Sequence, residues 1–548
     1  MTGLWRSCIG GRRPLPRPAL PRLLSRSAHF RHAAVPDDGP PRSERTSCAR
    51  CSAAGRYRHS SRPPSPPPCS SPPRPPPRRP DPLPEDRHRQ AERLAKKLVK
   101  ASSGKSAHRH LEALQDIADD HGGNRAAGTA GHKASTEYVY RLLKKAGYDV
   151  SYQDFDFYES KTLREKLGVV SPGPREIKVA AYDFSAPSPQ GGLKAALAAP
   201  RVDDTPGCGL DDYAAGDFKG RIALVKRGAC TFQQKEEVAA KAGAVGLILY
   251  NHSGTAPVHG TVEDPAKAHI PAGGVSLADG EALAAAVAKG EVTVSLDVAT
   301  EATKVRTRNV IAETRGGSAD HVVTLGSHLD SVPEGPGIND NGSGSAGLLE
   351  VALKLAQETR KPGGKPANKV RFAWWSAEER GLLGSKYYVS QLSEKQRKQI
   401  ALYLNFDMIA SPNPVQFVYD GDDSDHKGSG PGPKGSAQIE RLINGFLDRK
   451  GAPHEGTDFD GRSDYGPFIA TGIPAGGTFT GAEGVKTPEQ AARYGGTAGV
   501  AYDRNYHGAG DTLANIDRKA FDTNIDVIAH AVGIYAHDLS SLDEPVKD

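Results

Sequence analysis

The sequence predicts an α/β protein whose main domain contains a doubly wound, mixed and mostly parallel sheet with helices on both faces. Strand-like apolar segments at 322–325, 370–375 and 400–406 alternate with helix-like segments at 343–358 and 382–392. Strands that alternate with helices typically form a parallel sheet, and functional sites lie beyond the carboxyl ends of its strands. The chain of 548 residues also exceeds what one hydrophobic core accommodates, so we expect more than one domain.

The amino-terminal ninety residues differ in composition from the rest of the chain. They contain 18 Arg, no Lys and 20 of the 42 Pro, whereas the remainder is net acidic. The pI of about 8.8 is therefore no argument for nucleic-acid binding by the folded part. We interpret residues 1–88 as a disordered leader or a misread N-terminus, because no apolar signal-peptide region follows Arg12 and Arg13. No run of 18 apolar residues occurs, so we expect no membrane-spanning helix.

Helical patterns precede the predicted sheet. One begins near Glu85, a second covers 110–121, and a third covers 135–146 and ends at Gly147, which fits a C-cap. Residues 148–157 alternate like a strand.

Residues 160–304 then form a separate unit without a group of catalytic side chains. Its strand-like segments lie at 222–225, 245–250 and 292–298, and its helix-like segments lie at 233–242 and 278–288. We expect a small domain inserted into the main one. Its two cysteines, Cys208 and Cys230, would contribute about 3 kcal/mol if they formed a disulfide, and such a pair favours an oxidising compartment.

Ionisable residues follow the three predicted strands at 322–325, 370–375 and 400–406 at their carboxyl ends. In strand order they are His328 and Asp330, then Glu378 and Glu379, then Asp407, with Asp340 in the first loop and Tyr506-His507 far downstream. Single residues of this kind are usually solvated or cap a helix. Their joint position after three buried strands instead favours a functional site.

Imidazole and carboxylate groups are the ligands that hydrolytic zinc centres use. The candidate ligands are His328, Asp340, Glu379, Asp407 and His507. Five ligands are too many for one catalytic ion, which keeps an open position. A bridging carboxylate would allow two ions about 3.5–4 Å apart to share the site.

Residue order and spacing at 95–158 and 306–548 resemble the secreted bacterial zinc aminopeptidases of metallopeptidase family 28 (clan MH), of the aminopeptidase S and aminopeptidase Y type. The shared segments are GGNR at 122–125, GSHLDSV at 326–332, GINDNGSGSA at 337–346, RFAWWSAEE at 371–379, YLNFDMI at 403–409 and GRSD at 461–464. The resemblance implies the zinc-peptidase fold and two zinc ions per chain. It implies His328 and Asp407 as ligands of one ion, Glu379 and His507 as ligands of the other, and Asp340 as the bridge.

The resemblance also implies roles for residues around the metals. Asp330 would orient His328. Glu378 would be the general base that takes a proton from the attacking water and passes it to the leaving amine. Tyr506 would donate a hydrogen bond to the developing oxyanion.

The same resemblance implies where the substrate binds. Glu378, Asp407 and the backbone around Arg462 would hold the free ammonium group of the substrate. Phe479 and Met408 would lie near the pocket for an apolar first side chain, although ordinary core packing is an equally good interpretation of both.

Two features depart from the family pattern. Asn505 and Gly510 stand where relatives often have a disulfide around the Tyr-His segment. Some relatives also bind Ca²⁺, and Asp522 and Asp526 match one half of that site. The other half would fall near Ala101, where the sequence offers no carboxylate, so we do not expect a calcium site.

Segments 217–232 and 242–251 resemble a protease-associated (PA) domain, a small α+β domain in which the equivalents of Cys208 and Cys230 can pair. In that family its usual role is a lid or a substrate-access surface. We therefore divide the chain into a leader at 1–88, a zinc peptidase domain at 89–158 and 306–548, and a PA insert at 159–305.

We expect a secreted dizinc aminopeptidase that acts as a monomer on peptide or protein N-termini and prefers apolar first residues such as Leu. We expect neither nucleic acid nor a membrane as a partner. One alternative is a carboxypeptidase or N-acyl amino acid hydrolase of the same clan. Another is a receptor-like binding protein, which would be expected to lack the metal ligands present here.

Overall fold

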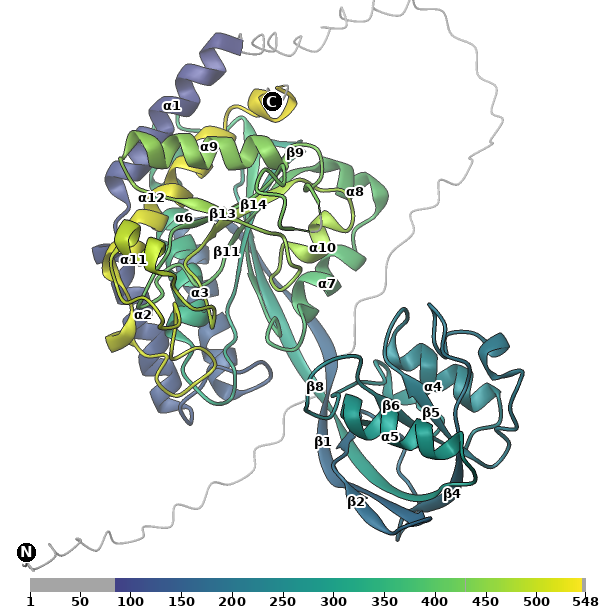
Figure 1. Cartoon of the computed structure of the whole chain (residues 1–548). Helices are drawn as coiled ribbons and strands as arrows, with labels where there is room; N and C mark the ends of the chain where they lie inside the picture. Colours follow the sequence, from purple (N-terminus) through teal and green to yellow (C-terminus); the bar gives the residue numbers. More distant parts are fainter. Residues whose placement is uncertain (1–83, 429, 545–548) are drawn as a thin grey trace, which may run out of the picture. The chain divides into compact units, whose positions relative to one another are not determined.

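The computed structural model describes residues 84–428 and 430–544 (Figure 1). Most of the predicted leader lies outside the described residues. Helix α1 begins at Pro84, so the last residues assigned to the leader are helical. Proline is tolerated in the first turn of a helix, where its missing N–H group is not needed.

The main domain comprises α1–α3, β1 and all elements from β8 onwards. Its helices are α1 (Pro84–Ala101), α2 (Gly104–Asp120), α3 (Ala130–Ala146), α6 (Gly344–Thr359), α7 (Leu383–Ser390), α8 (Glu394–Gln399), α9 (Ser436–Arg449), α10 (Gly466–Ile469), α11 (Pro488–Tyr494) and α12 (Arg518–Tyr535). Its strands are β1 (Asp149–Ser171), β8 (Thr293–Glu313), β9 (Ser318–His328), β10 (Asn368–Trp375), β11 (Ile400–Phe406), β12 (Phe417–Tyr419), β13 (Glu455–Thr457) and β14 (Ala475–Phe479).

The main-domain sheet is mixed and mostly parallel, with strand order β13-β12-β14-β11-β9-β10-β8. β9 pairs in parallel with β10 and β11, and β11 pairs in parallel with β14. β8 and β12 run antiparallel to their neighbours β10 and β14. The sheet class predicted from the alternating strand and helix patterns is therefore confirmed.

Side chains that alternate along the strands build a core on each face of this sheet. Phe372 and Trp374 of β10 pack into a large core with α1, α2, α3, α6, α9 and α12. Ala373 and Trp375 face the other way and pack with α7 and α10. Because neighbouring residues of a strand point to opposite faces, apolar residues in sequence are buried on both sides.

The inserted domain, which lies between β1 and β8 in sequence, has its own parallel strands and two small cores. Its elements are β2 (Arg175–Ile177), β3 (Ala180–Ala181), β4 (Leu193–Ala198), β5 (Ile222–Lys226), α4 (Phe232–Lys241), β6 (Gly246–Tyr250), β7 (Ala272–Val275) and α5 (Leu277–Val287). β4, β5, β6 and β7 pair in parallel, in this order. A disulfide joins Cys208 and Cys230, whose Cα atoms are 5.9 Å apart.

β1 and β8 form a two-stranded antiparallel ribbon that runs from the main-domain sheet into the inserted domain (Figure 1). The sequence predicts only 148–157 as a strand, but β1 continues to Ser171. The extra length is held by backbone hydrogen bonds to β8. Its residues 158–166 are exposed or only partly buried, so this stretch carries no apolar alternation. α3 likewise begins at Ala130, before the predicted 135, because Thr129 caps it by accepting a hydrogen bond from the His132 N–H group.

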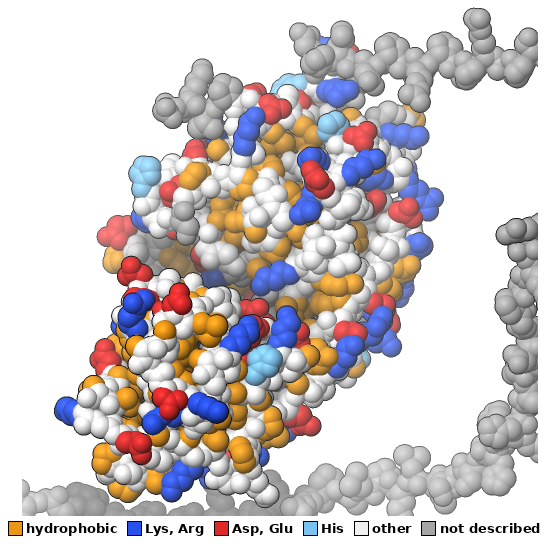
Figure 2. Space-filling model, turned by 90° about the vertical axis from the view of Figure 1, so that its right-hand side faces the viewer, with side chains coloured by type: hydrophobic (Ala, Val, Ile, Leu, Met, Phe, Trp, Pro, Cys, Tyr) orange, Lys and Arg blue, Asp and Glu red, His pale blue; other side chains and the backbone are white. Residues whose placement is uncertain are grey.

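The surface carries charges of both signs. Figure 2 shows Lys and Arg side chains interspersed with Asp and Glu over the face turned to the viewer. Within the described residues, no helix combines the length and apolar character needed to cross a bilayer.

Candidate metal centre

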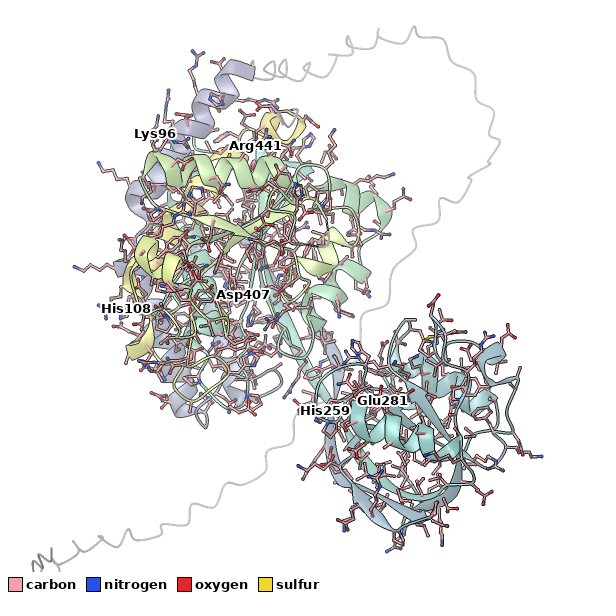
Figure 3. All side chains as sticks on the ribbon, viewed as in Figure 1. Lys96, His108, His259, Glu281, Asp407 and Arg441 are labelled. Atoms are coloured by element: carbon pink, nitrogen blue, oxygen red, sulfur yellow. A yellow bond between two sulfur atoms is a disulfide. The ribbon has the colours of Figure 1, made fainter. Side chains whose placement is uncertain are left out.

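The carboxyl ends of three neighbouring strands meet at one edge of the main-domain sheet. β9 ends at His328, which lies in register with Trp375, the last residue of β10. β11 ends one residue before Asp407, which lies in the interior of the main domain (Figure 3). The topology thus brings together side chains that are far apart in sequence.

The first group of candidate ligands consists of His328, Asp340 and Asp407. The Nε2 atom of His328 lies 3.2 Å from Oδ1 of Asp340 and 3.2 Å from Oδ1 of Asp407. All three residues are buried. Their ligand atoms lie within 4.8 Å of one another, as binding to one cation requires.

The second group consists of Asp340, Glu379 and His507. The Nε2 atom of His507 lies 3.2 Å from Oδ2 of Asp340 and 2.9 Å from Oε2 of Glu379. Asp340 therefore turns one carboxylate oxygen to each group. This arrangement is the one that a carboxylate bridging two ions needs.

The charges and pKa shifts of the centre favour the binding of cations. Burial lowers the pKa of His507, but hydrogen bonds to Asp340 and Glu379 outweigh it and raise the pKa to about 10. Burial and the Asp340 carboxylate raise the pKa of Glu379 to about 7. The Oε1 atom of Glu379 is buried without a hydrogen-bond partner among the described residues. A divalent cation would satisfy this oxygen and offset the repulsion between the carboxylates, and the nitrogen and oxygen donors suit zinc.

Glu378 lies beside the ligand groups without belonging to either. Its Oε2 atom is 3.9 Å from Nε2 of His328, and its backbone N–H group donates to Oδ1 of Asp330 over 3.3 Å. Burial, together with the nearby carboxylates of Asp407 and Asp464, raises the pKa of Glu378 well above its usual value. A carboxylate with a raised pKa next to a ligand centre is suited to accept and release a proton.

Asp330 contacts His328 on the Nδ1 side of the imidazole ring. The backbone carbonyl of Asp330 lies 3.1 Å from Nδ1 of His328, whereas its carboxylate Oδ1 lies 3.7 Å from the same atom. The closer contact is thus with the backbone. Both groups lie on the Nδ1 side of the ring and favour the tautomer that leaves Nε2 free for a metal.

A cavity opens from the centre, and the predicted substrate-binding residues Met408, Arg462 and Phe479 line it together with Tyr506. A guanidinium nitrogen of Arg462 lies 3.4 Å from the Tyr506 hydroxyl. Burial and the Asp340 carboxylate raise the pKa of Tyr506, so its hydroxyl keeps the proton that it would donate. Met408 is buried and Phe479 is partly buried, so each also packs against neighbours in the core.

Asp511 supports the centre and was not predicted from the sequence. Its carboxylate accepts the backbone N–H groups of Asn339 and Asp340 over 2.6 and 2.9 Å. It thereby fixes the backbone of the bridging residue. Its position four residues after His507 was the only signal that the sequence offered.

Arg125 is a second support residue that sequence reasoning left without a role. Its buried guanidinium donates to the carbonyls of Leu329, Pro336 and Gly337. These carbonyls lie in the loop that joins His328 to Asp340. The GGNR segment at 122–125 contains this residue, but its contacts depend on the folded loop.

Asp522 and Asp526, considered above for calcium, are engaged elsewhere in the main domain. Asp522 accepts the backbone N–H of Gly104 over 2.6 Å, and Asp526 pairs with Lys450. Two further acidic groups, Asp420-Asp422-Glu440 and Asp423-Asp425-Asp458, contain no imidazole. Asp420 and Glu440 hold the local loop by accepting the backbone N–H groups of Ser424 and Gly421.

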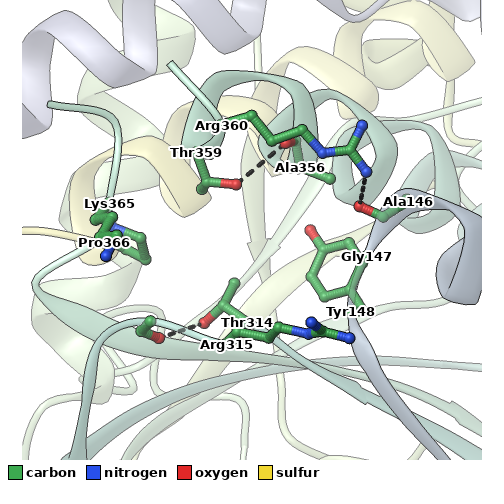
Figure 4. A pocket seen from close by; sticks show the side chains of 11 residues that line it. Ala146, Gly147, Tyr148, Thr314, Arg315, Ala356, Thr359, Arg360, Lys365 and Pro366 are labelled. Atoms are coloured by element: carbon green, nitrogen blue, oxygen red, sulfur yellow. Dashed lines mark hydrogen bonds between the residues drawn. The ribbon is translucent and has the colours of Figure 1, made fainter. Parts of the chain in front are cut away.

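A separate pocket of about 350 Å³ lies near the amino-terminal ends of β9 and β10 (Figure 4). Its wall includes Tyr148, Arg315 and Arg360, and Arg360 donates to the carbonyl of Ala146 at the end of α3. Its lining contains no His, Cys, Asp or Glu. It therefore lacks the metal-ligating groups found at the opposite ends of these strands.

The fold and the paired ligand groups define a metal-dependent hydrolase. The family models agree: residues 309–532 match "Peptidase family M28", and residues 193–283 match "PA domain". Among curated proteins, the chain is 46% identical over 433 residues to a probable lipoprotein aminopeptidase of Mycobacterium tuberculosis, covering 78% of this chain and 84% of that protein. It is 45% identical to a probable leucine aminopeptidase 2 of Arthroderma benhamiae, covering 78% and 83%.

Solved structures show the same relationship. The aminopeptidase from Aneurinibacillus sp. strain AM-1 superposes with a TM-score of 0.64 at 27% identity, covering 83% of this chain and 98% of that chain. A zinc aminopeptidase from Bacillus subtilis superposes with a TM-score of 0.50 at 28% identity, covering 78% and 94%. The chain belongs to peptidase family M28, as a zinc aminopeptidase with an inserted PA domain.

Proposed function

We propose that the protein is a two-zinc aminopeptidase that releases apolar N-terminal residues such as Leu from peptides. The observation that carries this proposal is the position of Asp340 between two ligand groups, with one carboxylate oxygen 3.2 Å from His328 and the other 3.2 Å from His507. His328 and Asp407 would hold one ion, and Glu379 and His507 the other. When bound, zinc polarises the peptide carbonyl and increases the acidity of water.

The residues of this chain supply the proton transfers and the orientation. Glu378 takes a proton from the attacking water and delivers it to the leaving amine, which its raised pKa supports. The Tyr506 hydroxyl donates to the carbonyl oxygen as negative charge develops on it. Asp330 and Asp511 act on the ligands rather than on the substrate, the former through His328 and the latter through the backbone of Asp340.

The cavity next to the centre supports exopeptidase action on a free amino terminus. Glu378 and Asp407 offer carboxylates to the substrate ammonium group, and both line the same cavity as Met408 and Phe479. The two apolar side chains would contact the first side chain of the substrate. This division of charge and apolar surface supports the preference for residues such as Leu.

The test compares hydrolysis of Leu-p-nitroanilide with that of N-acetyl-Leu-p-nitroanilide by the zinc-loaded protein. We expect Leu-p-nitroanilide to be hydrolysed and the acetylated compound to be nearly inert, because acetylation removes the ammonium charge that Glu378 and Asp407 recognise. Equal cleavage of both compounds would contradict the proposal and favour an N-acyl amino acid hydrolase.

We further propose that the protein is secreted. The Cys208–Cys230 disulfide supports this location, because structural disulfides persist mainly in oxidising compartments. N-terminal sequencing of protein recovered from the culture medium tests the proposal. Recovery of the protein only from the reducing cytosol would contradict it.

A further inference from the structure

A second cavity adjoins the metal centre, and neither Met408 nor Phe479 lines it. This groove has a volume of about 810 Å³ and shares Glu379 with the cavity described above. Its other walls come from β1, from the segment that follows Glu379 and the first turn of α7, and from loops of the inserted domain. If the first residue of the substrate lies toward Met408 and Phe479, the groove lies where the rest of the peptide leaves the centre.

Packing fixes the β1 wall of this groove next to the ligand loop. Phe155 and Phe157 form one apolar cluster with Ala377, which directly precedes Glu378. Glu159 also pairs with Arg380, the residue after Glu379, over 3.2 Å. These contacts place β1 residues 155–159 beside the metal ligands.

Two aromatic side chains of the groove, Tyr158 and Phe184, take no part in these contacts. Tyr158 is 44% exposed, and it contacts the ring of Phe184 edge-on with centroids 6.4 Å apart. Both residues line the groove. Tyr158 is exposed and Phe184 is partly buried, so together they offer an aromatic contact area to a peptide bound in the groove beside Glu379.

The backbone holds Phe184 in an uncommon conformation. Its φ angle is +62°, which is unfavourable for a bulky residue with a Cβ atom. Its N–H group donates to the Ser160 hydroxyl over 3.2 Å, which ties the inserted domain to β1 at this point. Strained positions of this kind often serve a functional contact.

We propose that Tyr158 and Phe184 form an aromatic platform that binds the second or third residue of the peptide and selects substrates with aromatic side chains there. This proposal rests on the function proposed above. It assigns a binding surface for the peptide residues that follow the cleaved bond. The β1–β8 ribbon and the inserted domain would then help to determine which peptides the enzyme cleaves.

The test measures kcat/KM of the zinc-loaded protein for leucinamide, Leu-Ala-Ala, Leu-Phe-Ala and Leu-Ala-Phe. We expect at least one aromatic tripeptide to be cleaved roughly 2- to 10-fold better than Leu-Ala-Ala, the range that an aromatic contact supplies. In Tyr158→Ala and Phe184→Ala, the ratio of kcat/KM for the aromatic tripeptide to that for Leu-Ala-Ala should fall to about one. Leucinamide hydrolysis should be unchanged. Leucinamide has no residue that reaches the platform.

Leu163→Ala is the matched control. Leu163 lies on the same strand and is 53% exposed, but it does not line the groove. It should keep the aromatic advantage. The proposal is overturned if the wild-type protein shows no advantage, or if the advantage persists in both aromatic variants. Failure to cleave leucinamide at all would instead contradict the proposed function.

Discussion

The main and inserted domains both place parallel strands next to helices, yet they use their buried ionisable side chains differently. In the main domain, buried imidazole and carboxylate groups converge at one sheet edge. In the inserted domain, the buried ionisable residues Lys235 and Glu236 of α4 hold loops instead: Glu236 accepts the backbone N–H groups of His269 and Ile270, and Lys235 donates to the carbonyl of Pro206. Among the described residues, every group of three metal-ligating side chains lies in the main domain.

The difference shows that the strand-and-helix architecture does not by itself make a site. A site also requires side chains of matching chemistry on several strand ends at the same edge. Under the proposed function, the inserted domain contributes a surface and a disulfide-linked scaffold, whereas the main domain contributes the chemistry. The following predictions test this division, in order of decreasing expected effect.

Removal of Glu378, the proposed general base, should have the largest effect. Glu378→Ala should lower kcat by roughly 10²- to 10⁴-fold, the contribution of general acid–base catalysis, and should leave the zinc content unchanged. Steady-state kinetics and elemental analysis of the same sample measure both quantities. Glu334→Ala, which alters an exposed carboxylate, is the control. Retained activity in the Glu378 variant would show that another residue is the base.

Removal of the disulfide should affect only the inserted domain. The double variant Cys208→Ser, Cys230→Ser should destabilise that domain by about 3 kcal/mol. Calorimetry should show an earlier transition for the inserted domain, and leucinamide hydrolysis below that transition should be unchanged. An equal loss of metal binding would mean that the two domains do not divide their roles in this way.

Acid should destabilise the main domain through protonation of Glu350. Burial raises the pKa of this residue, but hydrogen bonds from His110 and Ser106 and the nearby Lys354 outweigh burial and lower the pKa to about 2. Its unfolded value is 4.5, so its stabilising contribution is complete above pH 4.5 and is lost as the pH falls toward 2. The full contribution is about 3 kcal/mol.

Urea unfolding at several pH values measures this contribution. Glu350→Gln should lower the stability at pH 7 and flatten its decline between pH 4.5 and 2, because the group that takes up the proton is gone. Glu112→Gln, at an exposed position of α2, should leave the profile unchanged. An unaltered profile in the Glu350 variant would contradict the assigned pKa.

The smallest effect is expected at Asp330. Asp330→Asn should weaken zinc binding by roughly 10- to 100-fold, as is typical when a partner of a metal-ligating histidine is lost. Competition with a chelator measures the affinity directly. If the backbone carbonyl of Asp330 alone orients His328, as its shorter distance of 3.1 Å allows, the affinity will not change and the role assigned to the carboxylate is wrong.

The sequence allowed prediction of the elements whose pattern reflects burial. β9, β10 and β11 are apolar because both faces of the sheet are covered, and the prediction for β11, 400–406, matches its bounds. The full length of β1 was not predictable, because residues 158–166 are held by backbone pairing with β8 and are exposed or only partly buried. Thr129 as the cap of α3 was missed for a similar reason, since a cap depends on local backbone geometry.

The same distinction applies to the site. The candidate ligands were identifiable because a residue that follows a buried strand occupies a known edge of the sheet. Asp511 and Arg125 were not, because they act on backbone groups of the loop between His328 and Asp340. The sequence does not specify where that loop folds. The Tyr158–Phe184 contact was equally hidden, since it joins β1 to a turn of the inserted domain.

The central claim is that two ions bind on either side of Asp340. Anomalous diffraction at the zinc edge from crystals of the zinc-loaded protein tests it most directly. We predict two zinc peaks per chain, one beside His328 and Asp407 and one beside Glu379 and His507, with the Asp340 carboxylate between them. A single peak in fully loaded crystals, or peaks away from these residues, would contradict the account.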